Sequence, residues 1–206
     1  MMKYEKSAPD KALRQGELLS NVVEVIVNVN TIYSEELSLE QRTHPFAYVV
    51  SQDCDLDWDF HARKSQTQNH RIIPNVLLCE AMLATDLARQ LINVEGSKDS
   101  NKSRIWARVK INKDERFHFF QRVTETDDLT SNGVPELGID FKRHFTIPTE
   151  ELYTRIQYGQ TMRRCRLLSP YMEHLSDRFA YFLSRIALPE DHESESEIIK
   201  RDQDNT

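Results

Sequence analysis

The sequence predicts an α+β protein with a small β-barrel core, one crossing helix and a C-terminal helical lobe. Apolar and β-branched residues alternate in several segments before residue 148, which is typical of half-buried strands. After Pro148 the apolar spacing changes to that of helices. With 206 residues, of which 39% are apolar, the chain is long enough to bury one core of ordinary size.

The chain divides by composition into four expected regions. They are a flexible N-terminus over 1–14, a β-rich barrel core over 15–147, a C-terminal helical lobe over 148–189 and an acidic disordered tail over 190–206. The tail holds seven acidic and two basic residues, and its few apolar residues cannot offset the entropy lost on ordering. We therefore expect that deleting it leaves the melting temperature nearly unchanged.

Period-two alternation predicts six strands. Val23, Val25 and Val27 carry this pattern in the first of them, and Pro74 in the third points to an edge position or a bulge, because proline cannot donate to a ladder. The expected strands are 16–30, 46–52, 71–79, 104–111, 116–123 and 137–147. The turn between 104–111 and 116–123 is short, so these two are expected to pair as a hairpin.

Helical spacing predicts three helices. The first crosses the barrel over 80–95 and ends at Gly96, the second covers 148–156, and the third covers 169–189. The third has a continuous apolar face that includes Phe179 and Phe182. Left exposed, that face would form a large apolar patch, so we expect it to pack on the barrel.

Charge and composition bound the function class. No run approaches the ~18 apolar residues of a membrane span, and the N-terminus lacks the apolar stretch of a secretory signal. We therefore expect a cytoplasmic protein that does not enter membranes, with Cys54, Cys79 and Cys165 as free thiols. The net charge of −6 lies mostly in the tail. We expect no cofactor.

An acidic cluster follows the strand at 46–52, and three interpretations of it remain open. It contains Asp53, Cys54, Asp55, Asp57, Asp59 and His61. The aspartates can cap backbone groups where the strand ends, or the cluster can line a polar pocket with Cys79 and His118. Metal binding is the third, but no paired cysteine or histidine spacing supports it, and we expect no metal. Cys54 and Asp55 are expected at the end of a central strand, with a largely buried backbone.

Two further groups of residues are candidates for binding. Arg163, Arg164 and Arg166 precede the last predicted helix and can contact nucleic-acid phosphates, or they can pair with acids of the helices and tail. His118 and His144 fall on the strand faces opposite the apolar residues, where histidines are usually surface or pocket-rim groups.

The order of elements in about the first 80 residues resembles the MazF/PemK toxin family. The matching residues are Gly16 and Glu17, Pro45, and the segment Val49 to Asp53. The resemblance implies an SH3-like barrel and an RNA-cleaving site. Where the family has an arginine before the proline this chain has His44, with Arg42 two places earlier. The catalytic candidates are thus His44, Arg42, Ser51 and Asp53, since cleavage needs a base and a cation at the phosphate.

Two function classes follow from the sequence. The first is a non-catalytic interaction or accessory subunit of a toxin-like or defence-type module, which docks a larger protein partner through its barrel and C-terminal helix. The alternative is a nucleic-acid-binding protein or a ribonuclease of MazF/PemK type, with RNA or DNA as its partner. The acidic charge, the rarity of glycine and the lack of a recognised catalytic spacing favour the first.

Overall fold

The computed structural model of the chain describes residues 3–65, 69–92 and 99–184. Its strands form one seven-stranded antiparallel sheet in the order β1-β7-β2-β3-β4-β6-β5. The strands are β1 (Tyr4–Lys6), β2 (Glu17–Val27), β3 (Leu39–Val49), β4 (Asn75–Leu83), β5 (Phe117–Phe120), β6 (Leu137–Pro148) and β7 (Met162–Leu167). The helices are α1 (Asp53–Ser65), α2 (Ala84–Ile92), α3 (Asp99–Lys110), α4 (Thr149–Gln157) and α5 (Tyr171–Ser184).

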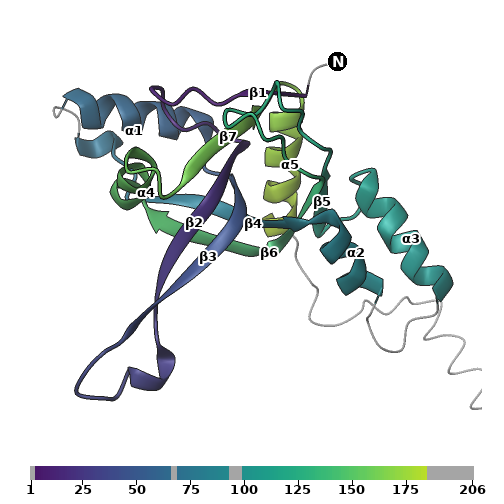
Figure 1. Ribbon diagram of the computed structural model, residues 1–206, viewed down its shortest axis with the longest axis horizontal. Coiled ribbons are helices and arrows are strands. Elements are labelled where there is room, and N and C mark those ends of the chain that lie inside the picture. The colour runs from purple at the N-terminus through teal and green to yellow at the C-terminus, as the bar shows by residue number, and fades with distance from the viewer. Residues whose placement is uncertain (1–2, 66–68, 93–98, 185–206) are drawn as a thin grey trace, which may run out of the picture.

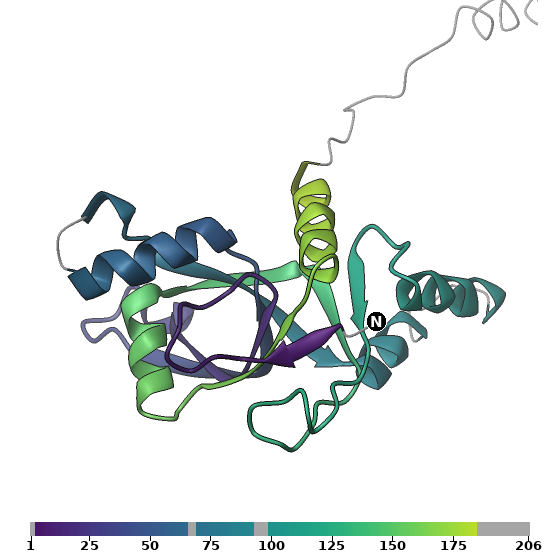
Figure 2. The ribbon, with the colours of Figure 1, turned by 90° about the horizontal axis from the view of Figure 1, so that it is seen from above.

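Three groups of helices cover the sheet. Figures 1 and 2 show α1 and α4 at one end, α2 and α3 at the other, and α5 between them. Each group has its own apolar cluster: Leu56 of α1 and Leu152 of α4 share one, while Leu87 of α2 and Val109 of α3 share another. Leu175 of α5 belongs to the third. The helices therefore cover the apolar residues on the faces of the strands.

The α+β class is confirmed, but a closed SH3-like barrel is not shown. The seven strands form an open sheet, with β1 and β5 at its two edges in the described residues. Short strands at both edges limit the exposed backbone that could pair with another chain. Among the described residues, no helix has both the length and the apolar content required to cross a membrane.

The expected division into a loose N-terminus, a core and a helical lobe does not match the sheet. Residues 4–6, expected to be flexible, form β1, and Tyr4 and Leu13 are buried. Within the predicted C-terminal lobe, residues 162–167 form β7, which lies between β1 and β2. The two ends of the chain thus complete one sheet, a long-range pairing that local periodicity does not reveal. The predicted acidic tail lies outside the described residues.

The segment 104–111 was predicted as a strand, and this was wrong: residues 99–110 form α3. The alternation rested on Ile105, Ala107, Val109 and Ile111. Ile105 and Ile111 are exposed, whereas Val109 is buried and packs with Trp106 against the β5 region at helical spacing. A short amphipathic segment can satisfy both periods, and tertiary contacts decide between them. Consequently β5 pairs with β6 and not with 104–111.

In the segment predicted as a helix over 80–95, residues 80–83 are strand and residues 84–92 are helix, and the remainder lies outside the described residues. β4 continues to Leu83, where it pairs with Leu137, and α2 starts only at Ala84. Pro74 lies just before β4, so it removes no donor from the ladder.

Helix α5 confirms the predicted packing of the C-terminal apolar face. Leu175 and Phe179 are buried, and the Phe179 and Phe141 ring centroids lie 5.6 Å apart. Phe182 is partly buried and contacts the same Phe141 ring, with a centroid distance of 5.6 Å. The face docks on the sheet of its own chain, so α5 does not offer it to a partner.

The hairpin of β2 and β3 projects beyond the rest of the sheet, as the lower part of Figure 1 shows. Its outer part, residues 23–43, is called the arm below. The strands pair from Val23 opposite Thr43 to Val27 opposite Leu39, and a 3-10 turn at Val29–Thr31 begins the connection between them. Strand β3 was predicted only from residue 46, because residues 34–45 are too polar to resemble a buried strand.

Candidate functional site

A polar pocket at the base of the arm brings together two of the predicted catalytic candidates, His44 and Arg42. It has a volume of about 490 Å³ and lies where β2, β3, β4 and β6 run side by side. The pocket is lined by Glu24, Arg42, His44, Glu80, Lys142, Arg143, His144 and Phe145. Because these residues come from four strands, the pocket depends on the register of the whole sheet.

Ion pairs join the charged groups of this pocket in one row. The carboxylate of Glu24 lies 3.7 Å from Nη1 of Arg42 and 3.2 Å from Nε2 of His44. On the other side of the ring, Nδ1 of His44 lies 3.4 Å from Glu80, in an ion-pair contact whose geometry falls short of a hydrogen bond. Arg143 completes the row with a 3.1 Å hydrogen bond to Glu80.

The two carboxylates favour the protonated form of His44. Its side chain is only 4% exposed and stacks on the Phe145 ring at a centroid distance of 4.1 Å. Burial by itself would lower the pKa of His44, but the contacts with Glu80 and Glu24 outweigh it and raise the pKa above its usual value. The contact with His44 likewise lowers the pKa of Glu80, with help from Arg143 and against the effect of burial.

Chemically, the polar pocket suits an anion better than a proton transfer. Both ring nitrogens of His44 face carboxylates, so neither is directed at a substrate in this arrangement. With His44 protonated, four cations of the lining face two carboxylates, which leaves a positive excess in a chain of net charge −6. A general base needs a ring nitrogen within hydrogen-bond distance of the substrate. His44 could offer such a nitrogen only if it broke its contact with Glu24 or Glu80.

The other two catalytic candidates, Ser51 and Asp53, lie outside the polar pocket. The Ser51 hydroxyl accepts a 2.8 Å hydrogen bond from the backbone N–H of Leu77. Asp53 begins α1 and accepts hydrogen bonds from the guanidinium of Arg14 and from the backbone N–H of Gln15. Both side chains therefore hold backbone segments together and are not directed at His44.

The acidic cluster is the first part of α1 and not the end of a strand, so the expectation of a buried Cys54 in β3 was wrong. Carboxylates in the first helical turn, with Arg63 and Lys64 in the last, match the helix dipole. Cys54 is exposed, and Asp55 is partly exposed beside it. Only Asp59 is fully buried, where it binds Arg63 and accepts a 2.9 Å hydrogen bond from the backbone N–H of Ile73.

The predicted pocket residues are not brought together. His61 is exposed and pairs with Asp57 at 3.8 Å, whereas Cys79 is buried in β4, where burial raises the pKa of its thiol to about 12. His118 is also buried, although it was expected on a surface or pocket rim. No group of three or more histidine, cysteine, aspartate or glutamate residues in the described parts of the chain could hold a metal ion.

His144, the other histidine expected at a surface or rim, is exposed at the polar pocket. Its Nδ1 lies 2.8 Å from the carbonyl oxygen of Phe141.

The three arginines proposed for phosphate contact are held by carboxylates of their own chain. Arg163 is buried and binds Glu17 through Nε and Nη2, at 2.6 and 2.8 Å. Arg164 is buried against Asp128, and the half-exposed Arg166 pairs with Glu5. Arginine in a bidentate internal pair has little capacity left for a ligand, so the guanidinium groups of Arg163 and Arg164 are engaged within their own chain.

Sequence reasoning missed Glu24, Glu80 and Arg143, although each contacts a neighbour in the polar pocket. Glu24 lies directly opposite Arg42 in the β2–β3 pairing. The signal available in sequence was a single acid inside the valine-rich run VVEVIV, since a charge in such a strand usually has a cross-strand partner. Which residue that partner is depends on the register.

We expect His44→Gln and His118→Gln to change the pH dependence of stability in opposite directions. The raised pKa of His44 means that its ion pairs stabilise the fold fully below about pH 6.5 and are lost as the pH rises through the folded-state pKa. Burial, together with the charges of Arg178 and His174, lowers the pKa of His118. The stabilisation that neutral His118 contributes to the fold is therefore present above about pH 6.5 and is lost as the pH falls.

Urea unfolding at about pH 6 and about pH 8 measures this difference. The loss of unfolding free energy in His44→Gln should be larger at the lower pH, and that in His118→Gln larger at the higher pH. Equal losses at both pH values in either protein would contradict the assigned protonation state.

Comparison with known proteins gives no relative. No family model matches the chain, and neither a curated protein nor a solved structure is similar to it.

Proposed function

We propose that the protein is a non-catalytic interaction subunit that docks on a protein partner through the arm. The observation that carries this proposal is the concentration of apolar side chains on a projecting hairpin. Seven of the fourteen exposed large apolar residues in the described parts of the chain lie within 25–39. They are Val25, Val27, Val29, Ile32, Tyr33, Leu37 and Leu39. Soluble proteins rarely expose apolar residues in such a group unless the group is a binding site.

The end of the arm is ordered by its own hydrogen bonds. The amide of Asn28 donates to Glu40 at 2.6 Å and accepts from the backbone N–H of Asn30 at 3.0 Å. The Thr31 hydroxyl donates to the carbonyl of Asn28 and accepts from the backbone N–H of Ser38. A tip fixed in this way loses little entropy on binding, which favours affinity. Yet its Tyr33 side chain is fully exposed and contributes nothing to the core.

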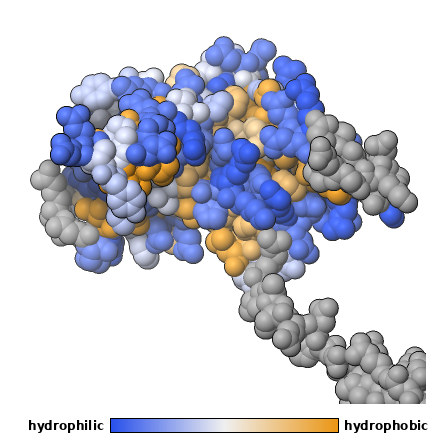
Figure 3. Space-filling view, turned by 90° about the horizontal axis from the view of Figure 1, so that it is seen from below, coloured by the Kyte–Doolittle hydropathy of each residue, from blue (hydrophilic) through white to orange (hydrophobic). Residues whose placement is uncertain are grey.

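The charge of the arm indicates the chemistry of the partner. No lysine, arginine or histidine occurs from residue 15 to 41, whereas Glu24, Glu35, Glu36 and Glu40 lie on the arm. Such a surface repels phosphates, so residues 25–41 of the arm are poorly suited to nucleic acid. It fits an apolar groove of a protein whose rim carries lysine and arginine. Figure 3, viewed from the side toward which the arm points, shows orange apolar surface among the blue polar surface.

The setting of this partner follows from the sequence. The resemblance to the MazF/PemK family suggests that the protein works in a toxin-like or defence-type module. We propose that the partner is another protein of that module. The three cysteines are free thiols, which suits the cytoplasm as the place of assembly.

Replacing two residues at the end of the arm should abolish the complex without affecting folding. In the double variant Ile32→Ser/Tyr33→Ser, we expect at least a tenfold loss of affinity, because aromatic and aliphatic anchors dominate interface energetics. The melting temperature should not change, since both side chains are exposed. The measurement is titration of the partner, purified after co-isolation from the source cells with the wild-type protein, against each variant.

The matched control is Tyr158→Ser/Leu183→Ser, which removes one exposed tyrosine and one exposed aliphatic residue outside the arm. It should bind the partner like the wild type. If the arm variant bound the partner as tightly as the wild type, the proposal would be contradicted. It would also be contradicted if the arm bound only a second copy of this chain or only nucleic acid.

The polar pocket favours a second candidate, the nucleic-acid-directed activity implied by the MazF/PemK resemblance. Its support is that His44 and Arg42 share a pocket of positive excess with Arg143 and Lys142. In this candidate Arg42 and Arg143 hold a phosphodiester. The protonated His44 turns away from one carboxylate and donates its proton to the leaving oxygen, while the freed carboxylate accepts the proton of the attacking hydroxyl. RNA cleavage by the purified protein that disappears in His44→Gln would favour this candidate over the interaction subunit.

A further inference from the structure

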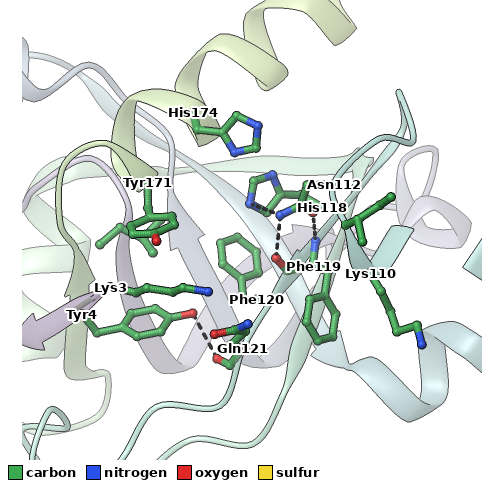
Figure 4. A pocket seen from close by; sticks show the side chains of 12 residues that line it. Lys3, Tyr4, Lys110, Asn112, His118, Phe119, Phe120, Gln121, Tyr171 and His174 are labelled. Carbon is green, nitrogen blue, oxygen red and sulfur yellow. Dashed lines mark hydrogen bonds between the residues drawn. The ribbon is translucent and has the colours of Figure 1, made fainter. Parts of the chain in front are cut away.

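A second pocket, separate from the arm and the polar pocket, lies between α5 and β5, beside β1 and the end of α3. Its volume is about 210 Å³, and Figure 4 shows its lining. Four aromatic rings form its walls: Tyr4, Phe119, Phe120 and Tyr171. The sequence does not group these four residues, because single aromatic residues on separate elements have no common spacing.

The buried His118 has a hydrogen-bond donor without a partner. Asn112 fixes its tautomer: the Asn112 oxygen accepts from the backbone N–H of Phe119 at 2.6 Å, and the amide nitrogen donates to the Phe119 carbonyl at 3.0 Å. The same amide nitrogen faces Nε2 of His118 at 3.4 Å, so Nε2 is the acceptor. The neutral ring therefore carries its hydrogen on Nδ1, which has no hydrogen-bond partner among the described residues.

The unpaired donor lies on the side of the His118 ring that faces His174, another residue of the pocket lining. In Figure 4, Asn112 lies on one side of the His118 ring and His174 on the other, and the two histidine ring centroids are 5.5 Å apart. A buried donor without a partner is energetically unfavourable, so it attracts a ligand oxygen. Nη1 of the neighbouring Arg178 is likewise buried without a partner.

The charge around this pocket favours an anion. Lys3 extends between the rings of Tyr4 and Tyr171, and its Nζ lies 5.3 Å from the Tyr171 ring centroid. Lys110 stands at the rim, and none of the described residues that line the pocket is acidic. Burial and the charge of Arg178 lower the pKa of His174, as expected in a positive field.

The rings are held in place by the sheet behind them. Phe120 stacks on Tyr48 at a centroid distance of 3.9 Å, and the Tyr4 hydroxyl donates to the carbonyl of Gln121 at 3.0 Å. Fixed aromatic faces favour a planar ligand, because nucleobases stack on aromatic side chains.

We propose that this pocket binds a nucleoside monophosphate. The base packs against the aromatic walls, Lys3 holds the phosphate, and Nδ1–H of His118 donates to an oxygen of the ligand. The site differs from the arm in place and in charge, so a protein partner and a nucleotide can bind to the same molecule.

Calorimetric titration with AMP, GMP, CMP and UMP tests the proposal. We expect at least one of them to bind, with affinity that falls as salt increases, because the phosphate contact is ionic. The variant Lys3→Ala should weaken binding about tenfold, as expected for a lost charged hydrogen bond. The matched control is Lys6→Ala, which removes an exposed lysine three residues further along the chain and outside the pocket, and it should bind like the wild type.

A second variant tests the histidine separately. His118→Phe keeps an aromatic ring at this position and removes the donor, and it should also weaken binding about tenfold. If it lowers the melting temperature strongly, Lys3→Ala still decides the question, since that side chain is not buried. No binding of any of the four nucleotides would overturn the proposal, and so would binding that neither variant weakens. Inorganic phosphate or an oligonucleotide that binds more tightly than every mononucleotide would also overturn it.

Discussion

Arg164→Ala is expected to lower the free energy of unfolding by about 3–5 kcal/mol, because it leaves Asp128 buried without its cation. Asp128 is fully buried and Arg164 nearly so. The guanidinium binds both carboxylate oxygens, at 2.8 and 2.7 Å, and donates to the Gly133 carbonyl at 2.9 Å. Burial alone would raise the pKa of Asp128, but Arg164 and Thr130 outweigh this effect and lower the pKa to about 2. The carboxylate therefore stays charged and depends on its partner.

Arg166→Ala is the matched control for this prediction. It lies two residues further along β7, and its pair with Glu5 is about one-third exposed. We expect it to cost no more than about 1 kcal/mol, since water and ions screen such pairs. Urea unfolding of both variants measures the difference. Equal losses would show that the pair of Arg164 and Asp128 is no more important than a surface ion pair.

Phe179→Ala is the second change with a large expected effect, a loss of about 3–5 kcal/mol. The Phe179 ring packs between Phe141 and His144, at centroid distances of 5.6 and 5.7 Å, and only 6% of the residue is exposed. Removing it leaves a cavity under the middle of α5 that neighbouring side chains cannot fill.

The partly buried Phe182 gives the comparison for this second change. It contacts the same Phe141 ring from nearer the end of α5, so Phe182→Ala should cost less than Phe179→Ala. Thermal unfolding of the two variants tests this order. An unchanged midpoint for Phe179→Ala would mean that α5 does not depend on its contact with the sheet.

Local patterns predicted those elements whose apolar residues face one side. The face of α5 and the strand at 137–147 were found in this way, because Phe179, Phe141 and Ile139 meet in one cluster. The same reasoning failed for 104–111, where Ile105 and Ile111 alternate but are exposed and Val109 decides the packing. Periodicity reports which residues are apolar, not which of them the tertiary structure buries.

The candidate sites depended on pairings that the sequence does not contain. The roles of Arg163 and Arg164 are set by Glu17 of β2 and by Asp128 in the connection between β5 and β6, which meet them only in the folded chain. The resemblance to a toxin family pointed to His44, but its partners Glu24 and Glu80 follow from strand register. The open sheet, in place of a closed barrel, likewise follows from the pairing order.

The central claim, that the arm docks on a protein, is tested most directly by site-specific photo-crosslinking in the source cells. A benzophenone side chain would replace Tyr33 at the end of the arm or, as a control of similar exposure, Tyr158 after α4. We predict one discrete protein adduct from position 33, absent from position 158, whose crosslinked peptides lie beside lysine or arginine residues. Adducts that are the same from both positions, or that contain only nucleic acid or a second copy of this chain, would contradict the account.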